Sequence, residues 1–280
     1  MIEQAQGLTP AALEAISDLE RRVVATDGGR LKLEWGVLRT RPSDQARDLL
    51  WWEDGRLLGF AGIYGYGSAP LEVTGMVDPR ARRRGIGRAM WDAAAKLCHE
   101  HGAERVLLVV PRVSVAGREF ARSIGLRHEH SEHALRLTRS PVGGGDGGGV
   151  GLRAAGIDDL EALSRLYDDG FHDGGHVDAS RLSDDRRRTL LVTKDNAVIG
   201  TIGVVRDGAR GAIYGFVIHS SQRGHGYGRA VLQRVCRDLL QDGAEYVDLE
   251  VATDNDHALG LYTSVGFDPL ATDDYYELGL

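Results

Sequence analysis

A glycine-rich stretch between a predicted strand and a predicted helix has the residue types and spacing that most suggest chemistry. It reads RGHGYG over residues 223–228, after a strand-forming run at 212–218 and before apolar residues that recur at helical spacing from Val231 to Leu240. Its three glycines remove side chains from a turn, and the first backbone N–H groups of a helix have no partner within it. The helix dipole adds partial positive charge there. The stretch therefore predicts a phosphate-binding loop.

Two common phosphate motifs do not fit this loop. A P-loop would end in Gly-Lys-Ser/Thr, but an arginine follows Gly228. A dinucleotide fingerprint counted from Gly224 would need its third glycine at position 229, which is the same arginine. The pattern that fits is Arg/Gln-x-x-Gly-x-Gly/Ala, formed by Arg223, Gly226 and Gly228.

The same pattern occurs 141 residues earlier, as RRRGIG over residues 82–87. The offset extends without a gap from Ile16 to Leu137, which matches Leu278. Near the start of this register, Ile16 and Leu19 match Ile157 and Leu160. A period of this length is too long for a solenoid repeat and has the size of one compact domain. The sequence therefore predicts a tandem duplication.

Each half shows the same order of predicted elements. A helix comes first, at 10–25 and 157–169, and hairpins follow at 49–63 and 190–205. The glycine-loop unit is next, then strands at 106–110 and 247–251, a second helix, and last strands near 134–137 and 275–278. This order predicts a mixed α/β sheet with helices on both faces.

The repeated loop resembles the pyrophosphate-binding signature of the GNAT superfamily of acyl-CoA-dependent N-acyltransferases. The stretch NDHALGLYTSVGF at 255–267 is similar to that superfamily's N-x-x-A-x-x-x-Y-x-x-x-G-F, whose asparagine and helix contact pantetheine and whose tyrosine stands near the cofactor's sulfur. The resemblance implies an α/β (α+β) fold of two tandem GNAT domains, each a mixed, mostly antiparallel sheet flanked by helices. We expect an N-terminal domain at 1–139, a glycine-rich linker at 140–150 and a C-terminal domain at 151–280.

The resemblance also implies acetyl-CoA as the acyl donor. We expect the loop in both halves to contact it, and in the second half also the free N–H groups of Phe216, Val217 and Ile218, where two parallel strands splay apart. The expected cofactor-binding residues are Met76, Val77, Arg82, Arg83, Arg84, Gly85, Ile86, Gly87, Arg88, Phe216, Val217, Ile218, Arg223, Gly224, His225, Gly226, Tyr227, Gly228, Arg229 and Asn255.

Acetyl transfer to an amine requires a base for the amine and an acid for the leaving thiolate. Tyr262 is the expected acid, because a phenol and a thiol differ in pKa by only about 1.5 units. Glu250 is the expected base, through a water, because related acetyltransferases carry a glutamate at that point of the strand. Both residues also have structural interpretations, as a core tyrosine and a salt-bridged carboxylate, and His219 is a rival base.

The first half has lost these chemical groups although its loop is intact. By the repeat register, Ala121 stands for Tyr262, Val109 for Glu250 and Ser114 for Asn255. We therefore expect an acetyl-CoA-dependent N-acetyltransferase that works in its C-terminal domain, by direct attack of a small-molecule primary amine on the thioester. The alternative is a non-catalytic acetyl-CoA sensor or scaffold.

Among tandem GNAT proteins the layout resembles that of the mycothiol synthase family. The similarity covers most of the chain, including the preserved first loop and the stretch from Glu250 to Tyr262. That family has a glutamate on the strand before the loop, and Ala212 takes its place here. A mycothiol-synthase-like acceptor is therefore one candidate among small amines.

Composition limits the other classes of partner. The net charge of −7 gives no reason to expect nucleic acid or an anionic membrane, and no apolar run is long enough to cross a bilayer. Cys98 and Cys236 fall on apolar helix faces in different halves, which favours core thiols in a reducing compartment and a cytoplasmic protein. The loop at 167–176 falls where GNAT folds usually admit the acceptor. Its histidines and carboxylates are expected to form a polar loop and no metal site.

Overall fold

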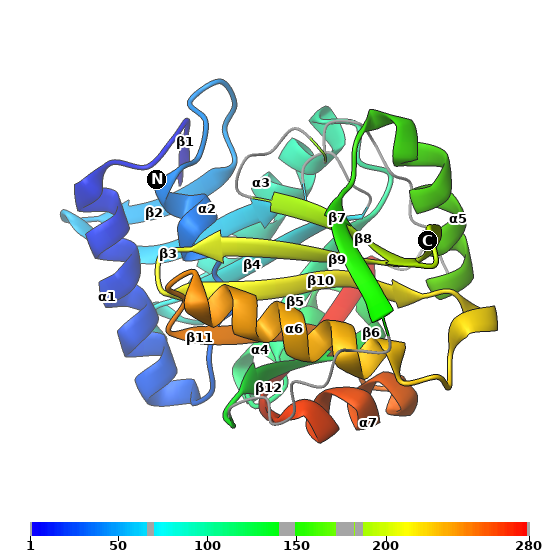
Figure 1. The fold of residues 1–280 in the computed structure, drawn as a ribbon. Helices are drawn as coiled ribbons and strands as arrows, with labels where there is room; N and C mark the ends of the chain where they lie inside the picture. Colours follow the sequence, from blue (N-terminus) through cyan, green and yellow to red (C-terminus); the bar gives the residue numbers. More distant parts are fainter. Residues whose placement is uncertain (1, 66–69, 140–148, 172–181, 183–186, 279–280) are drawn as a thin grey trace. The chain divides into compact units, whose positions relative to one another are not determined.

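A computed structural model describes residues 2–65, 70–139, 149–171, 182 and 187–278. The chain forms two compact units, whose helices and strands are labelled in Figure 1. Unit 1 comprises Met1–Glu132 together with Ala271–Leu280, and unit 2 comprises His133–Leu270. Each unit contains one copy of the glycine-rich loop.

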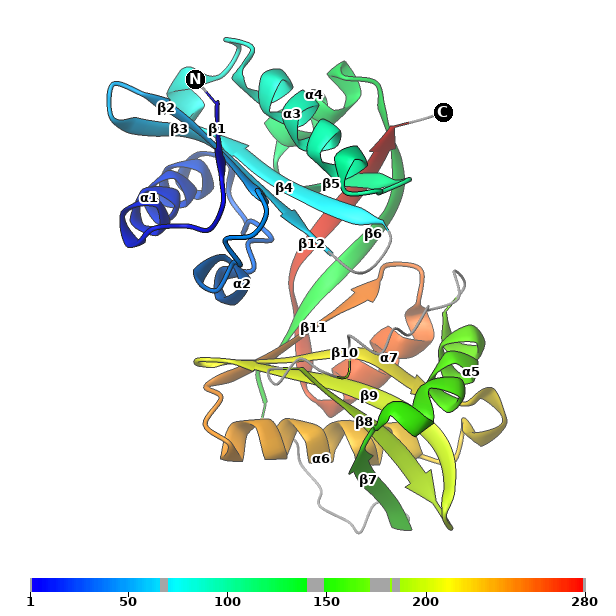
Figure 2. The ribbon, with the colours of Figure 1, turned by 90° about the horizontal axis from the view of Figure 1, so that it is seen from above.

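Unit 1 is a mixed sheet with helices on both faces (Figure 2). Its α-helices and strands up to β6 are β1 (Ile2–Ala5), α1 (Pro10–Asp27), α2 (Trp35–Arg39), β2 (Asp48–Glu53), β3 (Arg56–Tyr64), β4 (Leu71–Val77), α3 (Ile86–Glu100), β5 (Val106–Pro111), α4 (Val115–Ser123) and β6 (Leu126–Leu137). The strand order is β1-β2-β3-β4-β5, with β4 and β5 parallel and the other neighbours antiparallel. One core cluster joins α1 and α2 to the sheet, and another joins α3 and α4 to it.

Unit 2 repeats this layout. Its elements after β6 are β7 (Val150–Ala154), α5 (Leu160–Gly170), β8 (Arg187–Lys194), β9 (Ala197–Asp207), β10 (Arg210–Ile218), α6 (Tyr227–Gln241), β11 (Tyr246–Ala252) and α7 (Asp256–Val265). The chain then continues into β12 (Phe267–Leu278), most of which belongs to unit 1. The strand order is β6-β11-β10-β9-β8-β7, and β10 and β11 are the parallel pair. The core cluster on one face includes α5, and the larger one on the other face includes α6 and α7. The predicted mixed α/β fold is confirmed.

Tight turns set the register of the hairpin in each unit. Asp54 and Gly55 both have positive φ, of 49° and 73°, and so do Asp195 and Asn196, at 49° and 66°. Two consecutive residues of this kind match the right-handed twist of antiparallel strands. The hairpins expected at 49–63 and 190–205 are therefore present, as β2 with β3 and β8 with β9.

The last strand of each half is longer than expected and passes into the other unit. β6 leaves unit 1 after Glu132, and β12 enters unit 1 after Leu270. There β12 pairs with β5, from Asp273 opposite Pro111 to Glu277 opposite Leu107. The expected boundaries at 139 and 151 follow the sequence repeat, whereas the compact units exchange residues 133–139 and 271–280.

Charged and buried contacts explain why unit 1 holds the C-terminal strand. Arg105 and Arg112 bind Glu277 and Asp274, with closest N···O distances of 2.7 and 2.8 Å. Tyr275 is almost fully buried in unit 1. Its hydroxyl donates to Glu132 at 2.5 Å and lies 2.5 Å from Lys32 Nζ. Residues from the start of the chain and from its end thus complete one polar cluster.

The gap-free repeat register is wrong in the first helix. Ile16 is fully buried in the middle of α1, whereas Ile157 begins a short 3₁₀ turn and is 62% exposed. The apolar face of α5 is formed instead by Leu163, Leu166 and Tyr167. The two helices differ in length, so an ungapped offset cannot match both of their ends.

The two cysteines are buried and unpaired. Burial raises the pKa of the Cys98 thiol to about 11 and that of Cys236 to about 12, so both stay protonated near neutral pH. They act as core residues in α3 and α6. In the described residues, no helix combines the length and apolar character needed to span a membrane.

Candidate functional site

The glycine-rich loops have the same backbone form in both units. Gly85 and Gly226 are the N-caps of α3 and α6, with φ of 82° and 80°. Two residues earlier, Arg83 and Gly224 also have left-handed φ, of 64° and 81°. No side chain caps either helix. Among the described residues, the first N–H groups of α3 and α6 thus have no side-chain cap, which is the arrangement in which a helix start can bind an anion.

The arginine that opens each loop has a structural partner. Arg82 Nε donates to the carbonyl of Val77 at 3.2 Å, and its two Nη atoms bind Asp27 at the end of α1. In unit 2, Arg223 Nε donates to the carbonyl of Ile218 at 2.8 Å, and Nη2 binds Asp169 near the end of α5 at 3.0 Å. These guanidinium groups fasten the loop to the first helix of the unit.

Other predicted loop side chains also have local partners. Arg84 binds Glu53, and Arg88 donates to the carbonyl of Ser123 at 3.1 Å. The ring of His225 stacks on Tyr227, with centroids 5.6 Å apart. Backbone amides are therefore better placed than most of these side chains to supply the common phosphate contacts.

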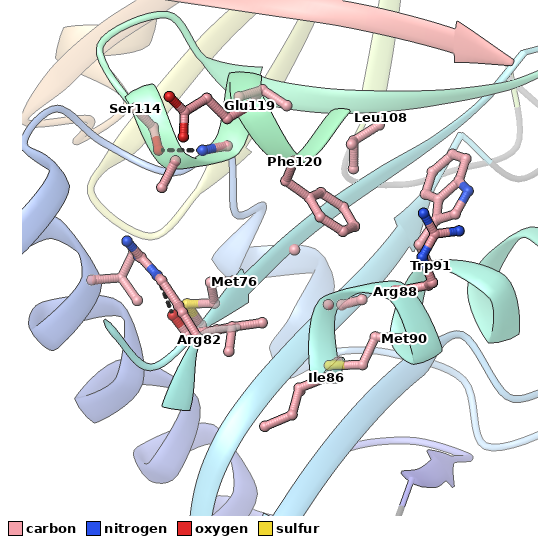
Figure 3. A pocket seen from close by; sticks show the side chains of 18 of the residues that line it. Met76, Arg82, Ile86, Arg88, Met90, Trp91, Leu108, Ser114, Glu119 and Phe120 are labelled. Atoms are coloured by element: carbon pink, nitrogen blue, oxygen red, sulfur yellow. Dashed lines mark hydrogen bonds between the residues drawn. The ribbon is translucent and has the colours of Figure 1, made fainter. Parts of the chain in front are cut away.

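A pocket of about 510 Å³ adjoins the loop of unit 1 (Figure 3). It runs from the start of α3 to the ends of β4 and β5 and along α4. Of the nine residues expected to bind the cofactor in this half, only Arg84 is not in its lining. The expected residues that line it are Met76, Val77, Arg82, Arg83, Gly85, Ile86, Gly87 and Arg88.

The parallel strands part next to each loop. The β4–β5 ladder runs from Leu71 opposite Val106 to Thr74 opposite Val109, although β4 continues to Val77. The β10–β11 ladder likewise ends at Ile213 opposite Leu249, whereas β10 continues to Ile218. The splay predicted in the second half is therefore present, and unit 1 has one at the equivalent place.

Only unit 2 has a bulge at this splay. The β9–β10 register shifts between Tyr214 and Val217, and Gly215 within the shift has φ of 55°. In unit 1, β3 and β4 pair without interruption from Gly59 opposite Val77 to Tyr64 opposite Glu72. A bulge redirects backbone groups away from the ladder. Sequence reasoning missed it, although the glycine at 215 is a signal for such a kink.

A tyrosine of α5 closes one side of the bulge. A Cβ atom placed on Gly215 would lie 2.6 Å from the hydroxyl oxygen of Tyr167. Tyr167 is buried, and its ring stacks on Phe171 with centroids 5.4 Å apart. Positive φ and this contact both require glycine at 215. Tyr167 and Gly215 thus form a part of the site that the sequence did not predict.

Tyr262 is the buried aromatic residue of α7. Its side chain is 8% exposed, and its ring meets Phe267 edge to face, with centroids 6.2 Å apart. Burial raises the pKa of Tyr262 to about 12. The phenol is therefore protonated at physiological pH and is a weaker acid than a free phenol. Ala121, its counterpart in α4, is fully buried and has no such group.

Glu250 lies on β11 one residue past the end of the β10–β11 ladder. Its neighbours Leu249 and Val251 are buried in the same cluster as Tyr262, whereas Glu250 is half-buried. Side chains alternate along a strand, so Glu250 is on the opposite face of the sheet from Tyr262. The expected acid and base therefore lie on opposite faces of the sheet.

Asn255 and His219 have structural contacts as well. Asn255 Oδ1 accepts from Ala258 N at 3.0 Å as the N-cap of α7, and Ser114 caps α4 in the same way. His219 begins the turn after β10, where its Nδ1 lies 2.9 Å from Ser221 Oγ and its Nε2 lies 4.0 Å from Asp169 Oδ1. The His219 side chain is partly exposed, so it could still reach solvent or substrate.

Asp169 joins α5 to the loop of unit 2. Ser220 binds it through both its hydroxyl and its backbone N–H, at 2.6 and 2.7 Å. These hydrogen bonds, together with the charges of His219 and Arg223, hold the pKa of Asp169 below its usual value. The carboxylate is thus a charged anchor for the turn at 219–223 and a poor proton acceptor at neutral pH.

Most of the expected acceptor loop falls outside the described residues, which end at 171 before resuming at 182. The same holds for most of the glycine-rich linker at 140–150. Among the described residues, no group of three or more histidines, cysteines and carboxylates is placed to hold a metal ion.

Comparisons with known proteins agree with the repeat. The family model described as "Acetyltransferase (GNAT) family" matches residues 12–126 and again residues 157–267. A mycothiol acetyltransferase of Kytococcus sedentarius is 30% identical, with 96% of this chain and 95% of that protein covered. A mycothiol acetyltransferase of Clavibacter sepedonicus is 28% identical over 78% of this chain and 76% of its own length.

Solved structures show the same fold over the full chain. A GCN5-related N-acetyltransferase from Sphaerobacter thermophilus has a TM-score of 0.79 at 19% identity, covering 99% of this chain and 94% of its own. A tandem GNAT protein from the clavulanic acid biosynthesis pathway has a TM-score of 0.72 at 21% identity, covering 100% and 99%. The prediction of two tandem GNAT domains is confirmed.

Proposed function

The chain belongs to the acetyltransferase (GNAT) family and is an N-acetyltransferase, and we propose that it moves an acetyl group from acetyl-CoA to a primary amine of a small molecule in unit 2. The observation that carries this assignment is the bulge at Gly215 beside splayed strands, because unit 1 has the splay without the bulge. Tyr262 and Glu250 near the same strands support it, since Ala121 and Val109 stand in their places.

Glu250 and Tyr262 divide the proton transfers between them. Glu250 takes a proton from the acceptor amine through a water, which frees the nitrogen lone pair to attack the thioester carbonyl carbon. Backbone N–H groups at the bulge stabilise the negative oxygen that forms as the new C–N bond is made. Tyr262 then gives its proton to the sulfur as the C–S bond breaks, and the second proton that the nitrogen loses as the amide forms returns to the Tyr262 phenolate. Burial raises the pKa of Tyr262 to about 12, so the phenol is protonated when the thiolate forms but is a weaker acid than a free phenol.

Unit 1 is proposed to bind the same class of cofactor without transferring its acyl group. Its loop has the backbone form of the loop in unit 2, and its pocket includes most of the residues that the motif predicts to bind the cofactor. The missing bulge, phenol and carboxylate give it no means of moving the two protons.

The acceptor is proposed to be a small amine related to the one used by the mycothiol acetyltransferases. The relative from Kytococcus sedentarius, a mycothiol acetyltransferase matched over 96% of this chain, supports an acceptor of the mycothiol-synthase kind. The mycothiol synthase family has a glutamate on the strand before the loop, and Ala212 takes its place here. This chain must therefore bind or deprotonate its acceptor differently from that family. The second candidate is a non-catalytic acetyl-CoA sensor, which the bare site of unit 1 favours.

A product assay separates these candidates. Purified protein is incubated with acetyl-CoA and an amino-sugar thiol, an aminoglycoside or a simple amine, and acetylated products are identified by mass spectrometry. We expect acetylation of the amino-sugar thiol by wild type and by Gly87→Phe, with loss in the matched variant Gly228→Phe. Binding of acetyl-CoA with no product from any amine of the panel would favour the sensor.

A further inference from the structure

The pocket of unit 1 passes through its sheet. Met90, Trp91 and Leu108 in its lining belong to the core cluster of α3 and α4. Phe60 and Leu31, also in the lining, belong to the cluster of α1 and α2 on the other face. Since the β4–β5 ladder stops at Thr74 and Val109, the pocket connects the two faces where the strands have parted.

The end of the pocket on the α1 face is apolar. Val23, Leu31, Phe60 and Met76 line it, and all four side chains are buried. We call the part of the pocket that these four residues line the apolar chamber. Phe60 and Met76 face each other across β3 and β4, so the chamber is built partly from the sheet itself.

The carboxylate that α1 contributes to the lining is already bound. Asp27 accepts from both Nη atoms of Arg82, at 2.8 and 2.9 Å, and from the hydroxyl of Ser114 at 3.0 Å. Its charge is thus compensated by a guanidinium group within the unit. A charged acyl group or a protonated amine would have to leave water for an apolar surface without a new partner, which is costly.

Unit 2 differs at the corresponding pair. The repeat register places Thr201 and Val217 where unit 1 has Phe60 and Met76, and these two also face each other across β9 and β10. The hydroxyl of Thr201 donates to the carbonyl of Leu190 at 3.1 Å. A phenyl ring and a thioether in unit 1 therefore replace a hydroxyl and a branched aliphatic group, which makes the wall in unit 1 the more apolar of the two.

We propose that unit 1 binds, without transferring, acyl-CoA thioesters whose acyl group is an uncharged hydrocarbon chain longer than acetyl, and that the chain lies in the apolar chamber. This rests on the proposed binding of acyl-CoA by unit 1. Unit 1 thereby selects its ligand by acyl-chain length, and unit 2 carries out acetyl transfer.

The test measures binding to full-length protein in which the loop of unit 2 is blocked. Gly228→Phe serves for this, because a Cβ atom there already lies 3.4 Å from Leu261 Cδ2. Isothermal titration calorimetry compares CoA, acetyl-CoA, butyryl-CoA and succinyl-CoA. Each buried methylene should tighten binding about fourfold, so butyryl-CoA should bind at least tenfold more tightly than acetyl-CoA. Succinyl-CoA should bind no better than CoA, and no thiol should be released.

Leu31→Asn tests the chamber itself, with Leu31→Ile as its matched control. In the Gly228→Phe background, Leu31→Asn should remove most of the preference for butyryl-CoA while the affinity for CoA stays within about twofold. Leu31→Ile should keep the preference. Equal affinities for acetyl-CoA and butyryl-CoA would contradict the proposal that the acyl chain lies in the apolar chamber. They would leave the proposed cofactor site in unit 1 standing. If Gly228→Phe binds no CoA at all while Gly87→Phe keeps one site, the only cofactor site is in unit 2. That result would contradict the proposed cofactor site in unit 1.

Discussion

Arg82 and Asp27 form a two-pronged ion pair in unit 1, with Nη1 2.8 Å from Oδ1 and Nη2 2.9 Å from Oδ2. The arginine of the glycine-rich motif thus ties the loop to the end of α1. Arg223 makes the equivalent connection to Asp169 in unit 2. We therefore expect the backbone N–H groups of the loops to supply the main phosphate contacts, and the two arginines to hold the loops in shape.

The first prediction is that the wild-type protein has two binding sites for acetyl-CoA. Gly85 and Gly226 both have left-handed φ with open space beside them, so a tryptophan at either position strains the loop and covers its amides. Each single variant should retain one site, and the double variant none. Calorimetric stoichiometry measures this. Two sites remaining in Gly85→Trp would mean that the loop of unit 1 is only structural.

Tyr262→Phe should lower turnover about 10²–10⁴-fold, which is the usual effect of losing one positioned acid. The ring remains to pack against Phe267, so the affinity for acetyl-CoA should change little. Steady-state kinetics and calorimetry on the same preparation measure the two quantities. Tyr246→Phe, on β11, is the control for loss of a hydroxyl elsewhere. Unchanged turnover in Tyr262→Phe would return this tyrosine to a purely structural role.

The base should be visible in the pH profile of kcat/KM. If Glu250 accepts the proton through water, the ascending limb should vanish or shift in Glu250→Gln, because the amide keeps the shape and cannot accept a proton. His219→Gln should retain that limb, since the His219 ring is placed by Ser221 at the start of the turn. The opposite result, with the limb lost only in His219→Gln, assigns the base to His219.

Gly215→Ala should reduce kcat/KM by at least tenfold. The new methyl group would require a strained φ and would meet the Tyr167 hydroxyl at 2.6 Å, so the bulge must shift. Gly260→Ala is the matched control in the same unit, because no atom lies within 4 Å of its added Cβ. Thermal unfolding of both variants separates loss of the site from loss of the fold. Wild-type kinetics in Gly215→Ala would show that the bulge has no catalytic role.

Asp48 should make unit 1 less stable as the pH rises. Burial raises its pKa from 3.8 to about 6, against the opposing effect of Arg41. The native state therefore holds this proton more tightly than the unfolded state, and the stabilising contribution is lost as the pH rises from about 4 to above 6. The free energy of unfolding of wild type minus that of Asp48→Asn should fall by about 3 kcal/mol across this range. A flat difference in urea titrations would contradict the shifted pKa.

Local patterns predicted much of the fold. Strand and helix periodicity gave the elements around each loop, and Asp54-Gly55 and Asp195-Asn196 fixed the hairpins because their turns demand positive φ. The length of β6 and β12 was missed, because polar residues such as His128 and Asp274 interrupt their apolar pattern. Those residues are satisfied by partners distant in sequence, among them Arg112 for Asp274.

The parts of the site that could be predicted from the sequence are those whose residue types and spacing form a recognisable motif. The loops follow from glycines, and Tyr262 follows from its place in a motif. The contact between Tyr167 and Gly215 was missed, since it joins a helix to a strand bulge 48 positions along the chain and depends on their packing. The ion pair of Arg82 with Asp27 was missed for the same reason, because Asp27 lies 55 residues away.

Because β6 and β12 each run from one unit into the other, the boundaries of the duplicated sequence segment differ from those of the compact unit. A fragment cut at the glycine-rich linker would keep a complete repeat of the sequence and yet leave β5 without β12, its antiparallel neighbour. The exposed strand edge that results is a template for association with other chains. Neither repeat is therefore expected to fold on its own. A gene fusion or truncation made at the boundary of the sequence repeat cuts through each of the two compact units.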